Sequence, residues 1–311
     1  MPNTHDHSLI NKETIWIVGD GRSGSTWLLE MINYDNQYRR MFEPFHPTKV
    51  ERMKGSEFFK YIRPEYQDET FYPLASEVFT GQFHHPRVTG GDNRFDKKLL
   101  IKDIFAHLFI KWVGTHFPPV KKILLMRHPF AIALSKQKLM KWDWMTEPKQ
   151  FLNQQALYQD YLQPYKKLIM KTKGYFEKQV LIWSIIHYVS LKQLTEEDIL
   201  LVFYEDLCST PEKELKRIFS YLAQSKKDQL TNPKLRDKIK APSISSRGHS
   251  AISQGKDLCD VWRKECSTSQ INNGIEILEL FGLEGIYNRS LMPNRVAVER
   301  FLLSESELTE F

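Results

Sequence analysis

Short runs of apolar, β-prone residues recur along the chain and alternate with segments whose apolar positions follow helical spacing. Each run is continuous rather than alternating, which is typical of strands in a parallel sheet covered on both faces. The predicted strands are 15–18, 99–101, 123–126 and 199–203. The predicted helices are 26–32, 129–141, 175–194 and 211–222. This alternation predicts an α/β fold with a central parallel sheet flanked by helices.

The pattern shows no internal repeat and no low-complexity linker, so we expect one domain over residues 1–311. An α/β fold of this length commonly forms a single domain. We expect a flexible N-terminus over 1–14, a core over 15–288 and a C-terminal tail over 289–311. Two aromatic-rich stretches, 58–73 and 142–165, fit the alternation poorly. They are either ordinary packed insertions or a cap that faces a substrate.

The composition argues against a nucleic-acid-binding protein, a disulfide framework and a thiolate zinc site. Lys and Arg number 44 against 38 Asp and Glu, a net charge of +6 that indicates either an ordinary solvated surface or a basic cleft for an anionic ligand. The chain has no dense Lys/Arg run and no known nucleic-acid module, so we expect no nucleic-acid partner. Three cysteines, a small and odd number in a long chain, argue against a disulfide framework. They form no CxxC pair, which argues against a thiolate zinc site.

The same features predict a cytoplasmic protein. Few cysteines suit a reducing compartment. No apolar signal segment follows the polar first residues, and the longest apolar stretch, 180–191, is too short to span a membrane. The oligomeric state cannot be predicted from the sequence.

A glycine-rich loop follows the first predicted strand. Residues 19–26 read GDGRSGST and nearly match the phosphate loop G-x-x-x-x-G-K-[ST], with Ser25 at the lysine position. Glycines let the backbone turn tightly, so that successive N–H groups converge on an anion at a helix N-terminus. The missing lysine makes ATP with magnesium less plausible, because that lysine reaches the β- and γ-phosphates in triphosphate hydrolases. Arg22 offers a guanidinium for a phosphate oxygen instead.

Residues 22–28, RSGSTWL, resemble the 5′-phosphosulfate loop of sulfotransferases that use 3′-phosphoadenosine 5′-phosphosulfate (PAPS). The resemblance implies a P-loop-type domain that uses no metal and releases PAP. Arginine at position 22 resembles the carbohydrate and tyrosylprotein branches, since cytosolic members carry lysine there. The residues that the resemblance assigns to the donor in this loop are Arg22, Ser23, Gly24, Ser25, Thr26 and Trp27.

A second motif follows the third predicted strand. Arg127 stands at the strand end, and Ser135 lies eight residues later, about two turns into the next helix. An arginine at a strand tip and a hydroxyl on the following helix can converge on one phosphate. Their spacing resembles the family's R-x7-S motif for the 3′-phosphate. Such a site disfavours ATP as the preferred ligand.

Three further segments resemble parts of the same family. The YEDL segment 204–207 implies that Tyr204 lies near the nucleotide. The segment 243–249, SISSRGH, resembles the loop over the 3′-phosphate and points to Arg247 and Gly248, although the R-K-G pattern of cytosolic members is absent. The end, 275–287, resembles the helix and "GY" ending of carbohydrate and tyrosylprotein members. Together the matches run from residue 15 to about residue 288.

The acceptor hydroxyl needs a base, and Glu43 is the candidate. Glu43 lies 21 residues after Arg22 and directly before a proline. The catalytic glutamate of carbohydrate and tyrosylprotein members stands in a similar "EP" or "EE" segment at a similar distance. We expect nearby apolar rings to raise the pKa of Glu43 toward the working range. Lys102, in a K-D segment like that of the tyrosylprotein branch, is expected to assist by offsetting charge. His46 is the rival base, and His107 is the first histidine after Lys102.

The combined prediction is a sulfotransferase that moves a sulfuryl group from PAPS to a hydroxyl by in-line displacement. Glu43 acts as base, Arg22 and Lys102 offset charge, and positioning supplies most of the rate. A sugar hydroxyl is the expected acceptor, with a peptide tyrosine or a hydroxylated natural product as alternatives. A small-molecule kinase with a variant loop, or a non-catalytic PAP- or glycan-binding protein, are the competing functions.

Overall fold

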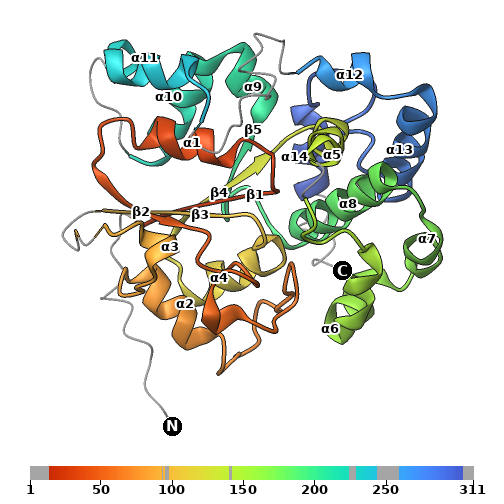
Figure 1. Cartoon of the computed structure of the whole chain (residues 1–311), viewed down its shortest axis with the longest axis horizontal. Helices are drawn as coiled ribbons and strands as arrows, with labels where there is room; N and C mark the ends of the chain where they lie inside the picture. Colours follow the sequence, from red (N-terminus) through yellow and green to blue (C-terminus); the bar gives the residue numbers. More distant parts are fainter. Residues whose placement is uncertain are drawn as a thin grey trace.

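The computed structural model describes residues 14–92, 94, 98–139, 142–223, 229–243 and 259–303. Its centre is a parallel sheet of five strands in the order β2-β3-β1-β4-β5 (Figure 1). The strands are β1 (Ile15–Gly19), β2 (Tyr38–Phe42), β3 (Lys98–Asp103), β4 (Lys121–Met126) and β5 (Leu200–Phe203). The register pairs Ile15 with Leu100 on one side and with Lys121 on the other. The predicted α/β class with a central parallel sheet flanked by helices is confirmed.

Alternate residues of β1 serve two separate hydrophobic clusters, because successive side chains of a strand point to opposite faces. Ile15 and Ile17 join the cluster on one face, and Trp16 and Val18 join the larger cluster on the other. The first face is covered by α1 (Ser25–Ile32), α9 (Tyr204–Ser209), α10 (Pro211–Tyr221) and α11 (Pro233–Lys240), which lie together in Figure 1. Both faces of the central strand are therefore buried, as its continuous apolar run predicts.

The larger cluster lies between the other face and a set of longer insertions. Its helices include α2 (Tyr72–Phe79), α4 (Ile110–His116), α5 (Pro129–Lys138) and α8 (Tyr175–Gln193), with α3 (Pro86–Thr89) beside β2. The rest of this side consists of α6 (Gln155–Leu157), α7 (Lys166–Lys171), α12 (Val261–Glu265), α13 (Thr268–Leu280) and α14 (Arg295–Leu303). Short helical turns lie at η2 (Glu51–Met53), η3 (His107–Phe109), η4 (Pro148–Asn153), η5 (Tyr158–Leu162) and η6 (Gln229–Thr231).

Strand β2 was not predicted, since its sequence YRRMF has no continuous apolar run. Arg39 is nevertheless 1% exposed. Its guanidinium donates hydrogen bonds to the carbonyls of Asp92 and Gly81, which satisfies the charged group inside the fold. Because a buried arginine interrupts the apolar run, the hydrophobic pattern does not predict this strand.

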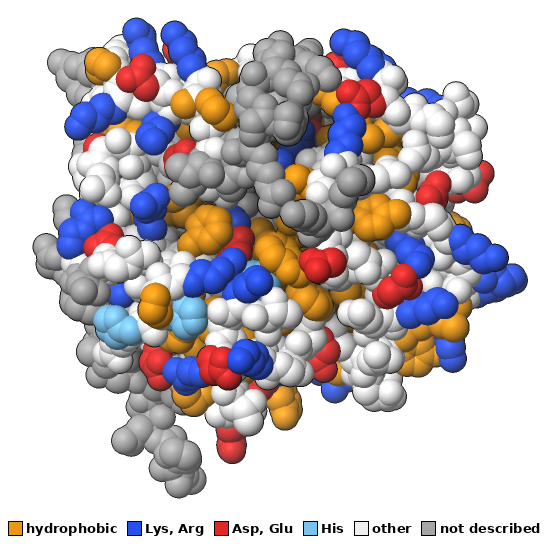
Figure 2. All heavy atoms as spheres, in the orientation of Figure 1, with side chains coloured by type: hydrophobic (Ala, Val, Ile, Leu, Met, Phe, Trp, Pro, Cys, Tyr) orange, Lys and Arg blue, Asp and Glu red, His pale blue; other side chains and the backbone are white. Residues whose placement is uncertain are grey.

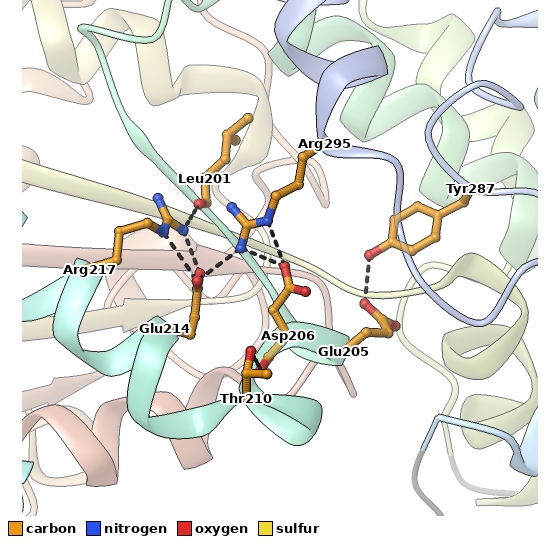
Figure 3. A network of polar contacts seen from close by, with 8 residues as sticks. All are labelled: Leu201, Glu205, Asp206, Thr210, Glu214, Arg217, Tyr287 and Arg295. Atoms are coloured by element: carbon orange, nitrogen blue, oxygen red, sulfur yellow. Dashed lines mark hydrogen bonds and ion pairs between the residues drawn. The ribbon is translucent and has the colours of Figure 1, made fainter.

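The C-terminal part holds the α14 helix, inside the segment 289–311 that we expected to be a tail. Arg295 donates from Nε to Asp206 at 2.8 Å and from Nη2 to Glu214 at 2.9 Å (Figure 3). Tyr287 donates from its hydroxyl to Glu205 at 2.8 Å. These contacts tie the C-terminal segment to α9 and α10, directly after β5. Residues 1–13 of the expected flexible N-terminus lie outside the described residues.

Surface charge is mixed rather than segregated on the face seen in Figure 2, where Lys and Arg side chains lie among Asp and Glu. None of the helices in the described part of the chain is long and apolar enough to cross a membrane. Within the same part, no group of three or more His, Cys, Asp or Glu side chains could hold a metal ion.

Candidate active site

The glycine-rich loop forms a turn that presents backbone amides at the N-terminus of α1. The Ser23 amide donates to the Asp20 carbonyl at 3.0 Å, and Gly24 has a φ of 96°, a conformation that favours glycine. No side chain caps the helix, and the buried Ser23 hydroxyl has no hydrogen-bond partner among the described residues. Uncapped helix amides and an orphaned hydroxyl are the groups that an anion would satisfy. The loop therefore fits a phosphate-type ligand.

The two motifs found in the sequence meet in the structure. Arg22 donates from Nε to the Ser135 hydroxyl on α5 at 3.1 Å, although 113 positions separate them. Arg127, directly after β4, donates from Nη1 to the Arg22 carbonyl at 2.9 Å. The loop after β1 and the helix after β4 thus share one set of basic and hydroxyl groups at the carboxyl edge of the sheet, where ligands bind in open α/β folds.

Tyr204 supports this set from the end of β5. The guanidinium carbon of Arg127 lies 4.1 Å from the centroid of the Tyr204 ring. A Cβ on Gly24 would come within 2.5 Å of the same ring, so the loop packs against tyrosine only with glycine there. Trp27 packs edge-on against Tyr204 at 5.8 Å and donates its indole N–H to the Lys238 carbonyl at 2.9 Å. The roles of Tyr204 and Trp27 in nucleotide binding stay predictions.

A buried ion pair below the loop was not predicted. Lys136, the residue after Ser135, places its Nζ 2.8 Å from both carboxylate oxygens of Asp20. The two side chains are 2% and 1% exposed. Trp142 covers the pair: its ring centroid lies 5.3 Å from Lys136 Nζ, and it leaves no room for a Cβ on Gly21. The pair joins the phosphate loop to α5, and it could not be found from sequence because nothing in either local pattern signals it.

The predicted base, Glu43, stands at the carboxyl end of β2 in a left-handed conformation with a φ of 57°. Its amide donates to the Lys102 carbonyl on β3 at 2.7 Å. Lys102 Nζ lies 2.7 Å from Oε1 of Glu43, and Arg87 Nη2 lies 2.8 Å from Oε2. Lys102 is buried, and its ammonium lies 4.3 Å from the centroid of the Phe42 ring. The structure thus brings two of the three predicted catalytic residues, Glu43 and Lys102, together. It adds Arg87, from α3, which sequence reasoning missed.

The expected rise in the pKa of Glu43 is wrong. Burial alone would raise the pKa of this carboxyl, but the two cations outweigh burial and hold its pKa below the ordinary value. Glu43 is therefore ionised at neutral pH. Arg87 lies 44 residues from Glu43 in a short helix without a recognisable motif, so only the folded chain reveals the contact.

The two other candidate histidines are buried. His46 packs edge-on against Phe105 at 5.0 Å and Trp144 at 4.7 Å, and burial lowers its pKa to about 4. Its Nδ1 accepts from the Thr48 amide at 3.3 Å, which occupies one ring nitrogen and disfavours His46 as the base. His107 lies on η3, where burial lowers its pKa well below the ordinary value. The His46 amide donates to the Glu43 carbonyl at 3.2 Å, so the histidine and the rings packed on it follow directly after the predicted base.

The remaining predicted residues are not all described. Arg247 and Gly248 lie outside the described residues, so their contact with a 3′-phosphate stays a prediction. Trp262, further along, stacks on His128 with ring centroids 4.2 Å apart. Glu205 accepts from the His128 amide at 2.9 Å and from the Tyr287 hydroxyl. The "GY" ending therefore supports the residue that follows Arg127.

Comparison with known proteins identifies the family. A sequence model described as "Sulfotransferase family" matches residues 14–228, more than half of the chain and the whole region that holds the sheet, the phosphate loop, Glu43 and Lys102. The chain belongs to the sulfotransferase family. The resemblance drawn from the motifs is confirmed. A sequence search of curated proteins found no match.

Solved structures of sulfotransferases are similar to this chain at low identity. A sulfotransferase domain from the curacin biosynthetic pathway is 17% identical, covers 86% of this chain and 97% of its own, and has a TM-score of 0.49. Mouse sulfotransferase SULT7A1 complexed with PAP is 18% identical, with coverage of 96% and 92% and a TM-score of 0.46. Retinol dehydratase in complex with androsterone and the inactive cofactor PAP is 17% identical, with coverage of 87% and 81% and a TM-score of 0.41. The family assignment rests on the sequence match.

Proposed function

We propose that this sulfotransferase transfers a sulfuryl group from PAPS to a hydroxyl group by in-line displacement. The observation that carries the proposal is the contact between Arg22 and Ser135, which unites the loop motif with the R-x7-S motif. One ligand with phosphate groups at both ends of a nucleoside suits such a pair of motifs. The PAP complex of mouse sulfotransferase SULT7A1 agrees with this choice of donor.

The residues present fit PAPS. The loop amides and the orphaned Ser23 hydroxyl would hold the 5′-phosphosulfate, with the Arg22 guanidinium beside them. Arg127 and Ser135 would hold the 3′-phosphate. When bound, PAPS supplies the sulfuryl group and leaves as PAP. The buried ion pair of Asp20 and Lys136 would keep the two halves of this site in register, because it links the loop to the helix that carries Ser135.

Glu43 would take the proton from the acceptor hydroxyl. Its lowered pKa keeps the carboxylate ionised, so it is ready to accept a proton at neutral pH. The two cations fix both of its oxygens and thereby its orientation. Lys102, already at Oε1, would also offset negative charge that develops on the transferring group. Arg87 would act as a positioning residue for Glu43.

A sugar hydroxyl is the acceptor we propose. Trp144 and Phe58, which are partly exposed and pack against the buried Phe105, would offer apolar ring surface to the C–H face of a sugar ring. Such rings also suit a hydroxylated natural product. A screen of acceptor hydroxyls with radiolabelled PAPS separates the two, because only one class should give labelled product at micromolar enzyme.

The test of the proposed chemistry is Glu43→Gln. The amide keeps the shape but cannot take a proton, so turnover should fall about 100-fold or more while PAP still binds. The matched control is Glu51→Gln on η2, whose carboxylate is 75% exposed and should leave turnover unchanged. Full turnover in Glu43→Gln would show that another group is the base.

A further inference from the structure

Two cysteine thiols lie in contact beside the proposed nucleotide site. Cys208 is on α9, and Cys259 is two residues before α12, so the contact joins segments that are 51 positions apart. The two thiols are hydrogen-bonded to each other, and both residues are partly exposed. The third cysteine, Cys266, follows α12 and has no such partner thiol among the described residues. The sequence alone indicated three ordinary reduced thiols.

Two packing contacts locate the pair independently. Cys208 lies one helical turn after Tyr204, whose ring faces the Arg127 guanidinium at 4.1 Å. Cys259 is three residues before Trp262, which stacks at 4.2 Å on His128, the residue that follows Arg127. Both cysteines are thus tied to the end of β4. Two charged groups act on both thiols: Arg127 lowers the pKa of each, and Glu205 raises it.

The surroundings shift the pKa values of the two thiols in opposite directions. The hydrogen bond with Cys259 and the attraction of Arg127 outweigh burial and lower the pKa of the Cys208 thiol. The same hydrogen bond and burial raise the pKa of Cys259. A thiolate is the nucleophile in disulfide exchange, and a cationic neighbour favours it. Cys208 is therefore the thiol that reacts first, and Cys259 is the thiol that resolves the product.

We propose that Cys208 and Cys259 form a reversible disulfide with glutathione disulfide as the oxidant, and that an occupied nucleotide site opposes its formation. The Cys208 thiolate attacks one sulfur of glutathione disulfide and releases one glutathione. Cys259 then loses its proton and attacks the Cys208 sulfur, which releases the second glutathione. The two cysteine sulfurs are oxidised by two electrons, and one glutathione disulfide is reduced to two thiols. In the disulfide the two sulfurs would lie about 2 Å apart.

The opposition between nucleotide and disulfide follows from Arg127 and rests on the proposed function. In the empty site, the positive charge of Arg127 favours the Cys208 thiolate. A bound phosphate would neutralise that charge, so the thiolate fraction and the rate of oxidation would fall. By linkage, the disulfide would in turn weaken nucleotide binding, since it fastens α9 to the start of α12 beside Arg127.

The experiment treats the full chain with glutathione disulfide and follows thiol loss and peptide mass. We expect the chain to lose two thiols and to yield one cross-linked peptide pair that contains Cys208 and Cys259. Dithiothreitol should restore both thiols. The matched control, Cys266→Ser, should oxidise in the same way, whereas Cys208→Ser should not form the internal disulfide. A stable glutathione adduct on Cys208, or a cross-link through Cys266, would overturn the proposal.

A second arm tests Arg127 without any nucleotide. Arg127→Met should slow alkylation of Cys208 by iodoacetamide about tenfold, the effect of one pKa unit. An unchanged rate would overturn the role of Arg127. Finally, saturating PAP should slow oxidation of the wild-type chain. If calorimetry shows PAP bound but oxidation is unaffected, the opposition is wrong; if PAP does not bind, the proposed function fails while the disulfide result stands.

Discussion

The ion pair between Asp20 and Lys136 is the most sensitive structural point of the proposed donor site. Each side chain is at most 2% exposed, and Lys136 Nζ contacts both carboxylate oxygens at 2.8 Å. Burial raises the pKa of Asp20 and lowers that of Lys136, and their mutual attraction offsets part of each shift. Replacing one partner therefore leaves a buried charge without compensation.

Lys136→Met should lower the free energy of unfolding by about 3–5 kcal/mol, the usual cost of breaking a buried pair on one side. With an m-value of about 3 kcal/mol/M, the urea midpoint should fall by roughly 1–2 M. The double variant Asp20→Asn/Lys136→Met removes both charges, so it should recover much of this loss. Urea unfolding followed by tryptophan fluorescence measures all three proteins.

The control lies on the same helix. Lys138 is 51% exposed and pairs with Glu265 at the surface, so Lys138→Met should cost less than about 1 kcal/mol. The reasoning is refuted if Lys136→Met costs no more than this control, or if the double variant is as unstable as Lys136→Met alone.

Three further predictions concern the site and its support. Gly24→Ala forces a side chain into a φ of 96° and against a buried aromatic ring, so PAP affinity by calorimetry should fall at least about tenfold; unchanged affinity would contradict the loop geometry. Arg87→Ala removes one of the cations that lower the pKa of Glu43, so that pKa should rise and the acid limb of the kcat/KM profile should move to higher pH. A limb that stays in place or moves down would show that Arg87 does not act through Glu43. Tyr287→Phe leaves Glu205 with one fewer buried donor and should cost about 1.5–3 kcal/mol in urea unfolding, whereas a loss below 0.5 kcal/mol, roughly the level of a surface change, would argue against this support.

Four of the five strands could be predicted because their residues form continuous apolar runs. β2 could not, since Arg39 occupies a buried position and is satisfied by carbonyls from distant turns. Helix ends were predicted to within a few residues: α5 ends at Lys138 rather than at residue 141. The local sequence indicates which residues are apolar, but it does not indicate which buried polar side chains form hydrogen bonds in the interior.

In the candidate site, too, some residues could be predicted from the sequence and others could not. Arg22, Arg127 and Ser135 belong to local motifs at strand ends, so the sequence indicates them and the parallel sheet brings them together. Arg87 and the pair under the loop belong to no motif and meet their partners only through the fold. The pKa of Glu43 was mispredicted for this reason. The apolar residues near it in the sequence suggested a raised pKa, but two cations that are remote in the sequence contact its carboxylate and lower the pKa.

The most direct test of the central claim is calorimetric titration of the purified protein with PAP, beside ATP with magnesium. The account predicts that PAP binds in preference to ATP and that Arg127→Ala weakens PAP about 10- to 100-fold, as expected for the loss of a charge-assisted hydrogen bond. Binding of ATP with magnesium and no preference for PAP would contradict the account and favour a kinase with a variant phosphate loop.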